Sequence, residues 1–324
     1  MRIIFHDNSI NLRGTSIALY DYAIHAQKSL GVSPIILYDS THPTTDQRAI
    51  DKFKQNFPIL SYSDSNDIDK IVSDNGVDAF FCIKRGRAYE SDFNVGSRNV
   101  PTFVNANSVC TDRDVQAFHD HYRGVFAFSS RWLSGLLSHR HPFVPHMIDM
   151  PSPTGDLREE LGIPQDDIVF GRTGGADTFD IPFVNHAVHD MLNSREDVWF
   201  LFQNTNQFIQ HDRAVFLLPS VDMMYKSNFI ATCDAMLHAR NHGESFGLSC
   251  GEFSTLGKPV ITYANSPEKS HIDILGLNGL YYTNKENLMN ILNTFSRDRD
   301  RDWNFYRDYT PQRVMSQFKQ VYLS

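Results

Sequence analysis

The chain has 324 residues, of which 41% are hydrophobic and 21% charged, and its formal net charge is −8. This length exceeds the usual size of a single hydrophobic core and favours two domains of roughly 150 residues each. The acidic balance, without a dominant block of Lys or Arg, argues against a nucleic-acid-binding protein, and no apolar run approaches the roughly 18 residues that a transmembrane helix needs.

The cysteines give no indication of a metal or redox centre. They are far apart, and none of their spacings is typical of metal ligands or of a redox pair: Cys82, Cys110, Cys233 and Cys250. Met1 leads directly into a short apolar strand pattern rather than into a signal peptide. We therefore expect buried thiols and a cytoplasmic protein, and the sequence leaves the oligomeric state open.

The first half of the chain alternates strand patterns with helical patterns. Residues 3–5 are predicted as a buried strand, and after a polar loop an amphipathic helix is expected over residues 16–30, ended by Gly31. Further strands are predicted at residues 34–38, 79–83, 102–105 and 125–128, and helices at residues 68–74 and 130–137. Strands that alternate with helices predict an α/β domain with a parallel, doubly wound sheet.

The second half repeats this organisation after a proline-rich segment. Residues 139–157 contain four prolines and are the best candidate for a linker. We place the boundary at Met150, so that residues 1–149 form one domain and residues 150–310 a second. Strands of the second domain are predicted at residues 168–172, 198–203, 215–218, 235–238 and 259–262, and a last helix at residues 311–322.

One segment of the second domain carries an arrangement suited to an anionic ligand. Glu244 lies in a glycine-flanked loop, and residues 249–256 are predicted as a short helix that Gly257 ends. The backbone N–H groups at the start of that helix, together with the helix dipole, favour a diphosphate there.

Two carboxylates flank this predicted anion site. Glu244 precedes it, and Glu252 follows after seven intervening residues, about one turn inside the helix. One carboxylate could accept hydrogen bonds from sugar hydroxyls and the other from ribose hydroxyls, which suits a nucleotide-diphosphate sugar. The plain alternative is a pair of solvent-facing glutamates beside a turn.

The same segment resembles a known family. The sequence Glu-Ser-Phe-Gly-Leu at residues 244–248, the glutamate spacing and Gly-Lys-Pro-Val-Ile at residues 257–261 resemble the donor-site signature of retaining glycosyltransferases with the GT-B fold, particularly glycosyltransferase family 4. The resemblance implies two Rossmann-like domains facing a cleft. It also implies that a carboxyl-terminal helix, here within residues 311–324, packs back on the first domain.

The resemblance further implies an activity. The enzyme would transfer a hexosyl or related sugar from a UDP- or GDP-sugar to a hydroxyl acceptor such as a glycan, with retention of the anomeric configuration. No metal and no other cofactor would be required, because cationic side chains and helix N–H groups can stabilise the departing diphosphate. The expected partners are therefore the donor and the acceptor, without nucleic acid.

A second loop is expected to contribute to the donor site. Arg172 ends an apolar strand in a position to bind phosphate oxygens, and Gly174 and Gly175 permit close approach of the backbone. This resembles the Gly-Arg element that opens the donor domain of the family. The family usually places a lysine soon afterwards, whereas acidic residues occupy that region here; Lys226 is the candidate substitute, with a surface lysine on a helix as the alternative.

The first domain matches the family less closely. Its loop before residue 16 keeps only Gly14 where the family has a glycine-rich loop, and Thr15 either contacts the donor or caps the following helix. Asn105 stands where the family commonly has a histidine. An asparagine cannot act as a general base, but its amide can bind a sugar hydroxyl while the departing phosphate takes the acceptor proton.

These considerations give a set of candidate site residues. The catalytic candidates are Glu244, Arg172 and Asn105. The donor-binding candidates are Glu252, Ser245, Phe246, Gly247, Leu248, Gly174, Gly175, Gly14, Thr15, Lys226 and Asn204, the last of which has a turn-forming role as its alternative. Two other functions stay open: a catalytically degenerate protein that binds nucleotide-sugars, and a GT-B nucleotide-sugar epimerase.

Overall fold

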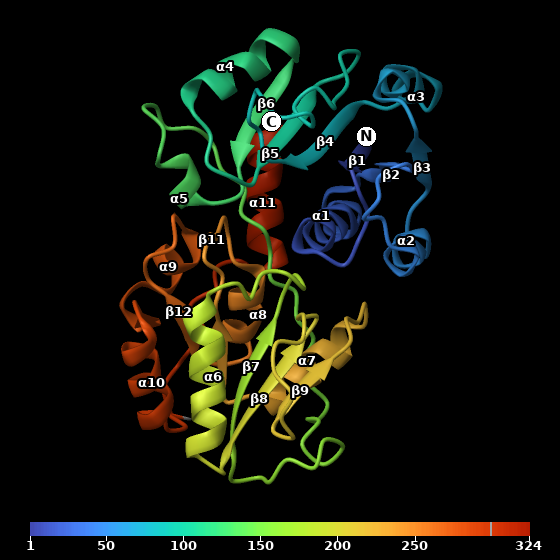
Figure 1. Ribbon diagram of the computed structural model, residues 1–324. Coiled ribbons are helices and arrows are strands. Elements are labelled where there is room, and N and C mark those ends of the chain that lie inside the picture. Colours follow the sequence, from blue (N-terminus) through green and yellow to red (C-terminus); the bar gives the residue numbers. More distant parts are fainter. Residues whose placement is uncertain (299) are drawn as a thin grey trace. The chain divides into compact units, whose positions relative to one another are not determined.

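Figure 1 shows the computed structural model, which describes residues 1–298 and 300–324. The chain forms two compact units: unit 1 comprises Met1–Met147 and Tyr309–Ser324, and unit 2 comprises Ile148–Asp308. Each unit contains a six-stranded sheet in which neighbouring strands are parallel. The predicted α/β class with two doubly wound parallel sheets is therefore confirmed.

Unit 1 has the strand order β3-β2-β1-β4-β5-β6. Its strands are β1 (Arg2–Asp7), β2 (Ser33–Asp39), β3 (Ile59–Tyr62), β4 (Ala79–Lys84), β5 (Thr102–Ala106) and β6 (Gly124–Phe128). Its helices are α1 (Gly14–Leu30), α2 (Gln47–Lys54), α3 (Ile68–Asp74), α4 (Asp112–His121), α5 (Arg131–Ser134) and α11 (Pro311–Tyr322), with a short 3-10 turn at Ser65–Asp67.

Side chains from both faces of this sheet are buried, as expected for a parallel sheet covered by helices. Ile4 and Phe80 belong to one core cluster with Val72 of α3 and Phe118 of α4. The neighbouring residues in β1 and β4 point to the opposite face, where the ring of Phe81 packs against α11. Helix α11, red in Figure 1, is thus part of unit 1 although it ends the chain.

Unit 2 has the strand order β14-β12-β10-β7-β8-β9 and a separate two-stranded sheet of β11 and β13. Its strands are β7 (Ile168–Thr173), β8 (Val198–Gln203), β9 (Ala214–Leu217), β10 (Ala235–His238), β11 (Gly243–Glu244), β12 (Val260–Tyr263), β13 (Glu268–Lys269) and β14 (Leu280–Tyr282). Its helices are α6 (Pro182–Ser194), α7 (Met223–Thr232), α8 (Leu248–Thr255), α9 (Ser270–Leu275) and α10 (Lys285–Thr294), with a 3-10 turn at Gly276–Asn278.

Numbered within its own unit, each sheet has the order 3-2-1-4-5-6, which is the doubly wound order of dinucleotide-binding folds. In unit 2 the chain reverses its direction of progress across the sheet between β7 and β10, which pair with each other. Ligands of such sheets bind outside the carboxyl ends of the strands at this switch point. The loops that follow β7 and β10 are therefore the place to look for a site.

Two predicted elements end earlier than expected. The helix predicted over residues 130–137 is observed only as the short helix α5, which ends with Gly135 as its C-cap. The strand predicted over residues 215–218 is observed as β9, which ends at Leu217 and leaves Leu218 83% exposed.

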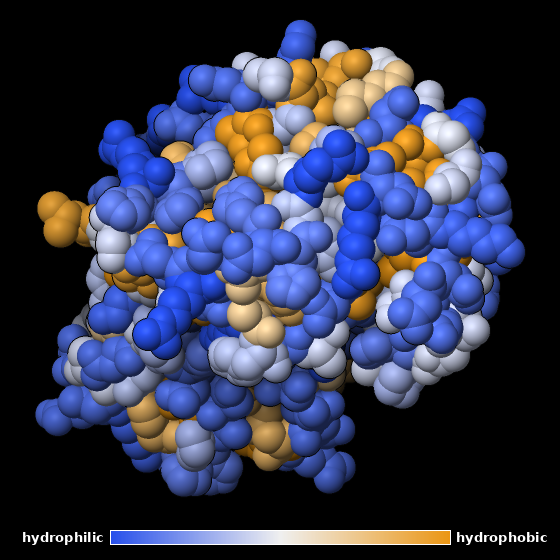
Figure 2. Space-filling view, turned by 90° about the horizontal axis from the view of Figure 1, so that it is seen from above, coloured by the Kyte–Doolittle hydropathy of each residue, from blue (hydrophilic) through white to orange (hydrophobic). Residues whose placement is uncertain are grey.

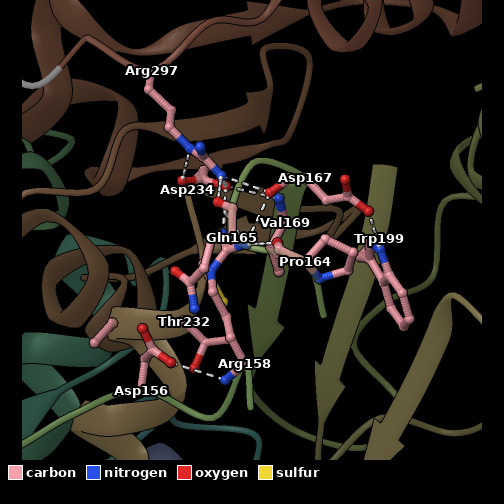
Figure 3. A network of polar contacts seen from close by, with 12 residues as sticks. Asp156, Arg158, Pro164, Gln165, Asp167, Val169, Trp199, Thr232, Asp234 and Arg297 are labelled. Carbon is pink, nitrogen blue, oxygen red and sulfur yellow. Dashed lines mark hydrogen bonds and ion pairs between the residues drawn. The ribbon is translucent and has the colours of Figure 1, made fainter. Parts of the chain in front are cut away.

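A polar network holds together the opposite, amino-terminal edge of the unit 2 sheet (Figure 3). Asp234, which directly precedes β10, accepts hydrogen bonds from Arg158 at 3.0 Å, from Arg297 at 2.7 Å and from the backbone N–H of Val169 at 2.8 Å. Arg158 and Arg297 also donate to the backbone oxygen of Asp167. We interpret Asp234 as a structural residue.

The surface is mainly polar on the face shown in Figure 2. The large hydrophobic residues that are exposed come from separate segments of the described chain: Met1, Tyr89, Val109, Leu136, Leu218 and Leu277. All four cysteines are buried, and none of them forms a disulfide. No helix among the described residues has both the length and the apolar composition needed to cross a membrane.

Candidate functional site

The site in unit 2 is built at the carboxyl ends of three adjacent strands. Arg172 lies at the end of β7, His238 is the last residue of β10, and Thr262 lies at the end of β12. Because β10 and β12 are parallel, His238 and Thr262 are direct register partners. The strand ends thus bring polar side chains from distant parts of the sequence to the switch point.

Glu244 lies just beyond β10, in the short strand β11 that pairs with β13. Its Oε1 is 3.1 Å from Nε2 of His238, and its Oε2 accepts a hydrogen bond from Arg240 at 2.9 Å. Burial acts to raise the pKa of Glu244, but the charge of Arg240 and the hydrogen bond from His238 outweigh it and lower the pKa to about 2. Glu244 is therefore an ionised, oriented acceptor at neutral pH.

The hydrogen bonds continue behind His238. Its Nδ1 is 2.8 Å from the hydroxyl of Thr262, and that hydroxyl is 3.0 Å from Nε2 of His271 in α9. Thr262 and His271 have no exposed surface, and His238 is only 5% exposed. Burial lowers the pKa of His271 to about 3, so this ring is neutral at physiological pH.

Helix α8 begins directly after the loop that carries Glu244, one residue earlier than predicted. Its N-cap is Gly247 with φ of 89°, where a Cβ would lie 2.9 Å from Cβ of His271. Phe246 is buried against the ring of Tyr306, whose hydroxyl donates to the carbonyl of Phe246 at 3.0 Å. The start of α8 is thus held in place while Ser245 and Leu248 remain half-buried.

Glu252 lies in the second turn of α8 and is 3% exposed. Its Oε1 accepts a hydrogen bond of 2.5 Å from Nζ of Lys226 in α7, and its buried Oε2 has no partner among the described residues. Lys226 therefore neutralises Glu252 here, rather than presenting a free charge as expected of a substitute phosphate-binding cation. A buried carboxylate oxygen without a partner is suited to accept from a ligand hydroxyl.

Arg172 is 3% exposed, and its guanidinium turns back onto its own loop instead of pointing outward. Its terminal nitrogens donate to four acceptors: the carbonyls of Asn204 and Gly175 and the hydroxyls of Thr205 and Thr178. Burial lowers the pKa of Arg172 to about 10, which leaves it charged at neutral pH. Its direct role is to order the loops after β7 and β8.

This packing explains three other predicted residues. A Cβ at Gly174 would lie 2.9 Å from Nη2 of Arg172, so the glycine lets the loop pass over the guanidinium. Gly175 supplies one of the carbonyl acceptors. Asn204 has φ of 52° and its amide donates to the carbonyl of Gly174 at 2.7 Å, which matches the turn-forming alternative for this residue.

The candidates of unit 1 differ from expectation. Asn105 is fully buried in β5, where its amide nitrogen donates to the hydroxyl of Tyr22 and to the carbonyl of Val144, both at 3.0 Å. We therefore correct the expectation that it binds a sugar: the side chain ties β5 to helix α1. Gly14 is exposed at the first position of α1 and Thr15 is half-buried, so both are accessible.

Arg240 and three buried residues of the unit 2 site were not among the predicted ones; the buried residues are His238, Thr262 and His271. Their signal in the sequence is partial. His238 and Thr262 are polar residues at the ends of apolar strand patterns, and ligands of parallel sheets bind at the carboxyl ends of the strands. His271 has no such signal, because its place depends on how α9 packs against β12. Among the described residues, no group of three or more His, Cys, Asp or Glu side chains could hold a metal ion.

Comparisons with known proteins agree with this architecture. No protein-family model matches the sequence, and a search by sequence among curated proteins finds no relative. Solved structures do match: HepE of Anabaena in complex with UDP and glucose has a TM-score of 0.71 at 14% identity, covering 99% of this chain and 98% of that chain.

Two further structures show the range of the similarity. The sucrose-phosphate synthase of Thermosynechococcus elongatus matches with a TM-score of 0.63 at 12% identity over 98% of this chain and 95% of that chain. A UDP-N-acetylglucosamine 2-epimerase matches with a TM-score of 0.60 at 10% identity over 99% and 96%. At such identities the similarity establishes the fold. The chain has the GT-B type of fold, which glycosyltransferases and nucleotide-sugar epimerases share.

Proposed function

We propose that the protein is a metal-independent glycosyltransferase that transfers a hexosyl or related sugar from a UDP- or GDP-sugar to a hydroxyl acceptor, with retention of configuration. The observation that carries the proposal is the pair of glutamates on either side of the start of α8. Glu244 is ionised and oriented by Arg240 and His238, and Glu252 has one buried oxygen without a partner. The GT-B fold supports a nucleotide-sugar ligand for this pair.

Each part of the site has a role in this proposal. The backbone N–H groups at the start of α8 bind the diphosphate, with Ser245, Gly247 and Leu248 lining it. Glu252 accepts from the ribose hydroxyls and Glu244 from the sugar hydroxyls. Arg240 is charged and one-third exposed beside Glu244, so it contributes positive charge where the phosphate departs. The departing phosphate itself takes the proton of the acceptor hydroxyl.

Donor binding tests the proposal directly. Isothermal calorimetry with UDP, GDP, ADP and their glucose conjugates should identify one base that binds to the wild-type protein. Glu252→Gln keeps the size of the side chain and removes its charge. Because a hydrogen bond to a charged group contributes roughly 1.5–3 kcal/mol, this variant should bind that nucleotide at least about tenfold more weakly.

The matched control is Glu286→Gln in the first turn of α10, where the glutamate is exposed and distant in sequence from the site. It should bind like wild type. Nucleotide binding that is absent in the wild-type protein, or equal in Glu252→Gln and wild type, contradicts the site assignment.

A nucleotide-sugar epimerase is the second candidate, because the 2-epimerase structure shares the fold across nearly the whole chain. Product analysis separates the two reactions. An epimerase converts the donor into its epimer in the absence of any acceptor. A transferase releases nucleoside diphosphate and transfers the sugar to an acceptor or to water. A protein that binds the donor and changes it in neither way is a degenerate homologue.

A further inference from the structure

A continuous chain of hydrogen bonds runs from Glu244 into the interior of unit 2. It passes from Glu244 to His238 at 3.1 Å, from His238 to Thr262 at 2.8 Å and from Thr262 to His271 at 3.0 Å. Its members come from β11, β10, β12 and α9. Only the Glu244 end reaches the surface, since that side chain is 20% exposed and the other three are buried.

The hydrogen-bonding capacity of each group shows what the members of this chain can do for one another. The ionised carboxylate of Glu244 only accepts, so Nε2 of His238 carries a proton and donates. The Nδ1 atom of His238 is 2.8 Å from the hydroxyl of Thr262, and the same hydroxyl is 3.0 Å from Nε2 of His271. A hydroxyl group can donate to one ring and accept from the other, and a hydrocarbon side chain can do neither.

Arg240 alone would hold Glu244 less firmly. Its guanidinium contacts only Oε2 and is 33% exposed, so solvent screens this ion pair. His238 contacts Oε1 from a strand end and is itself held by Thr262. The two contacts together determine the plane of the carboxylate, and the buried one depends on the residues behind it.

We propose that His238, Thr262 and His271 are positioning residues that orient the carboxylate of Glu244 for the sugar of the donor. This inference rests on the proposed function, because it assigns Glu244 to the sugar rather than to the nucleotide. We call these three residues the relay. The proposal predicts that the relay determines how much the sugar adds to the binding affinity of the nucleotide. The nucleotide itself binds at α8 and Glu252, which lie outside the relay.

The test compares two substitutions of one residue. Thr262→Val removes the hydroxyl and keeps a side chain of similar shape, whereas Thr262→Ser keeps the hydroxyl. Dissociation constants are measured by calorimetry for UDP and UDP-glucose, and for GDP and GDP-mannose. In Thr262→Val the gain in affinity from nucleotide to nucleotide-sugar should fall about tenfold, with nucleotide binding within about twofold of wild type. Thr262→Ser should retain most of the gain.

A second pair of variants covers the case in which Thr262→Val does not fold. His238→Gln can place an amide N–H near the position of Nε2 and donate to Glu244, whereas His238→Asn is too short to do so. The gain should survive better in His238→Gln than in His238→Asn. His271 is left unchanged, because it lies beside Gly247 at the start of α8, and a substitution there would not separate the effect on Glu244 from an effect on the phosphate site.

The outcomes separate the two proposals. A wild-type protein that binds none of the four ligands overturns the proposed function and the relay's role with it. The relay alone is overturned if the wild-type protein binds both nucleotide and nucleotide-sugar and Thr262→Val shows the same gain in affinity. Where Thr262→Val is unfolded, the same gain in His238→Asn overturns the relay. An equal loss of nucleotide and nucleotide-sugar binding in these variants also overturns it, since that is the effect of a general structural role.

Discussion

Asp7, at the end of β1, carries a carboxyl group whose ionised form is disfavoured by burial. It is half-buried, its Oδ2 accepts from the hydroxyl of Ser16 at 3.1 Å, and its Oδ1 lies 3.5 Å from the backbone nitrogen of Ser9. Burial raises the pKa of Asp7 to about 6 in spite of these hydrogen bonds. The folded protein therefore binds this proton more tightly than the unfolded chain, in which the pKa of an aspartate is about 3.9.

This shift predicts a pH-dependent effect of Asp7→Asn. The stability that protonated Asp7 allows is fully present below about pH 4 and is lost as the pH rises through about 6. The neutral amide avoids this loss. Asp7→Asn should therefore raise the free energy of unfolding by about 2 kcal/mol at pH 8 and leave it nearly unchanged at pH 4. Urea unfolding at pH 4, 6 and 8 measures the difference.

Asp46 provides a control of opposite sign. It is the N-cap of α2, and the hydrogen bond from Arg48 lowers its pKa. Asp46→Asn should thus lose more stability, relative to wild type, at pH 8 than at pH 4. Asp7→Asn should show the opposite trend and gain stability at pH 8. An Asp7→Asn variant without extra stability at pH 8 would show that the carboxylate of Asp7 is not destabilised by burial.

At the scale of elements, Asp234 joins the amino-terminal edge of the unit 2 sheet to two other segments (Figure 3). Arg158 comes from the segment before β7 and Arg297 from the segment after α10, and both form ion pairs with Asp234. The side chain of Arg158 is 6% exposed and that of Arg297 is 22% exposed. Both arginines thus form their ion pair with the same carboxylate.

Removing that carboxylate should be strongly destabilising. Asp234→Ala removes the ion-pair partner of both guanidinium groups and leaves Arg158 almost without solvent, so the free energy of unfolding should fall by about 3 kcal/mol or more. The comparison is Asp302→Ala, which breaks an ion pair with Arg307 in which both side chains are more than half exposed. That variant should be nearly as stable as wild type. Equal urea midpoints for the two variants would contradict the structural role of Asp234.

At the scale of the whole molecule, the two ends of the chain belong to the same unit. Phe318 of α11 is fully buried, and its ring centroid lies 5.3 Å from that of Phe81 in β4 and 5.7 Å from that of Tyr22 in α1. Tyr322 of the same helix donates a hydrogen bond to the carbonyl of Val104 in β5 at 3.1 Å. Unit 1 therefore completes its core only when the last residues of the chain are in place.

Phe318→Ala should destabilise unit 1 by roughly 3–5 kcal/mol, the cost of replacing a buried phenylalanine by alanine. Limited proteolysis with mass mapping should then find the first new cuts within residues 1–147. Gln320→Ala, an exposed position of the same helix, should leave the cleavage pattern unchanged. First cuts within residues 148–308 would show that α11 does not support the core of unit 1.

The sequence by itself determined the class of fold and the position of the two glutamates around the start of α8. The strand over residues 235–238 and the helix over residues 311–322 occur where the patterns predict them, because each element encodes its own burial in the local period of apolar residues. The glutamate spacing around Gly247 likewise needs only local information, since the loop and the helix that carry it are consecutive.

Only the tertiary structure decided which groups the predicted site residues contact. The amide nitrogen of Asn105 donates to the hydroxyl of Tyr22 in α1, and the guanidinium of Arg172 turns back onto the loops after β7 and β8. His238 meets Thr262 because parallel strands place residues distant in sequence at the same level of the sheet, and His271 meets Thr262 because α9 packs there. Such contacts depend on strand register and helix packing, which the local pattern of apolar residues does not specify.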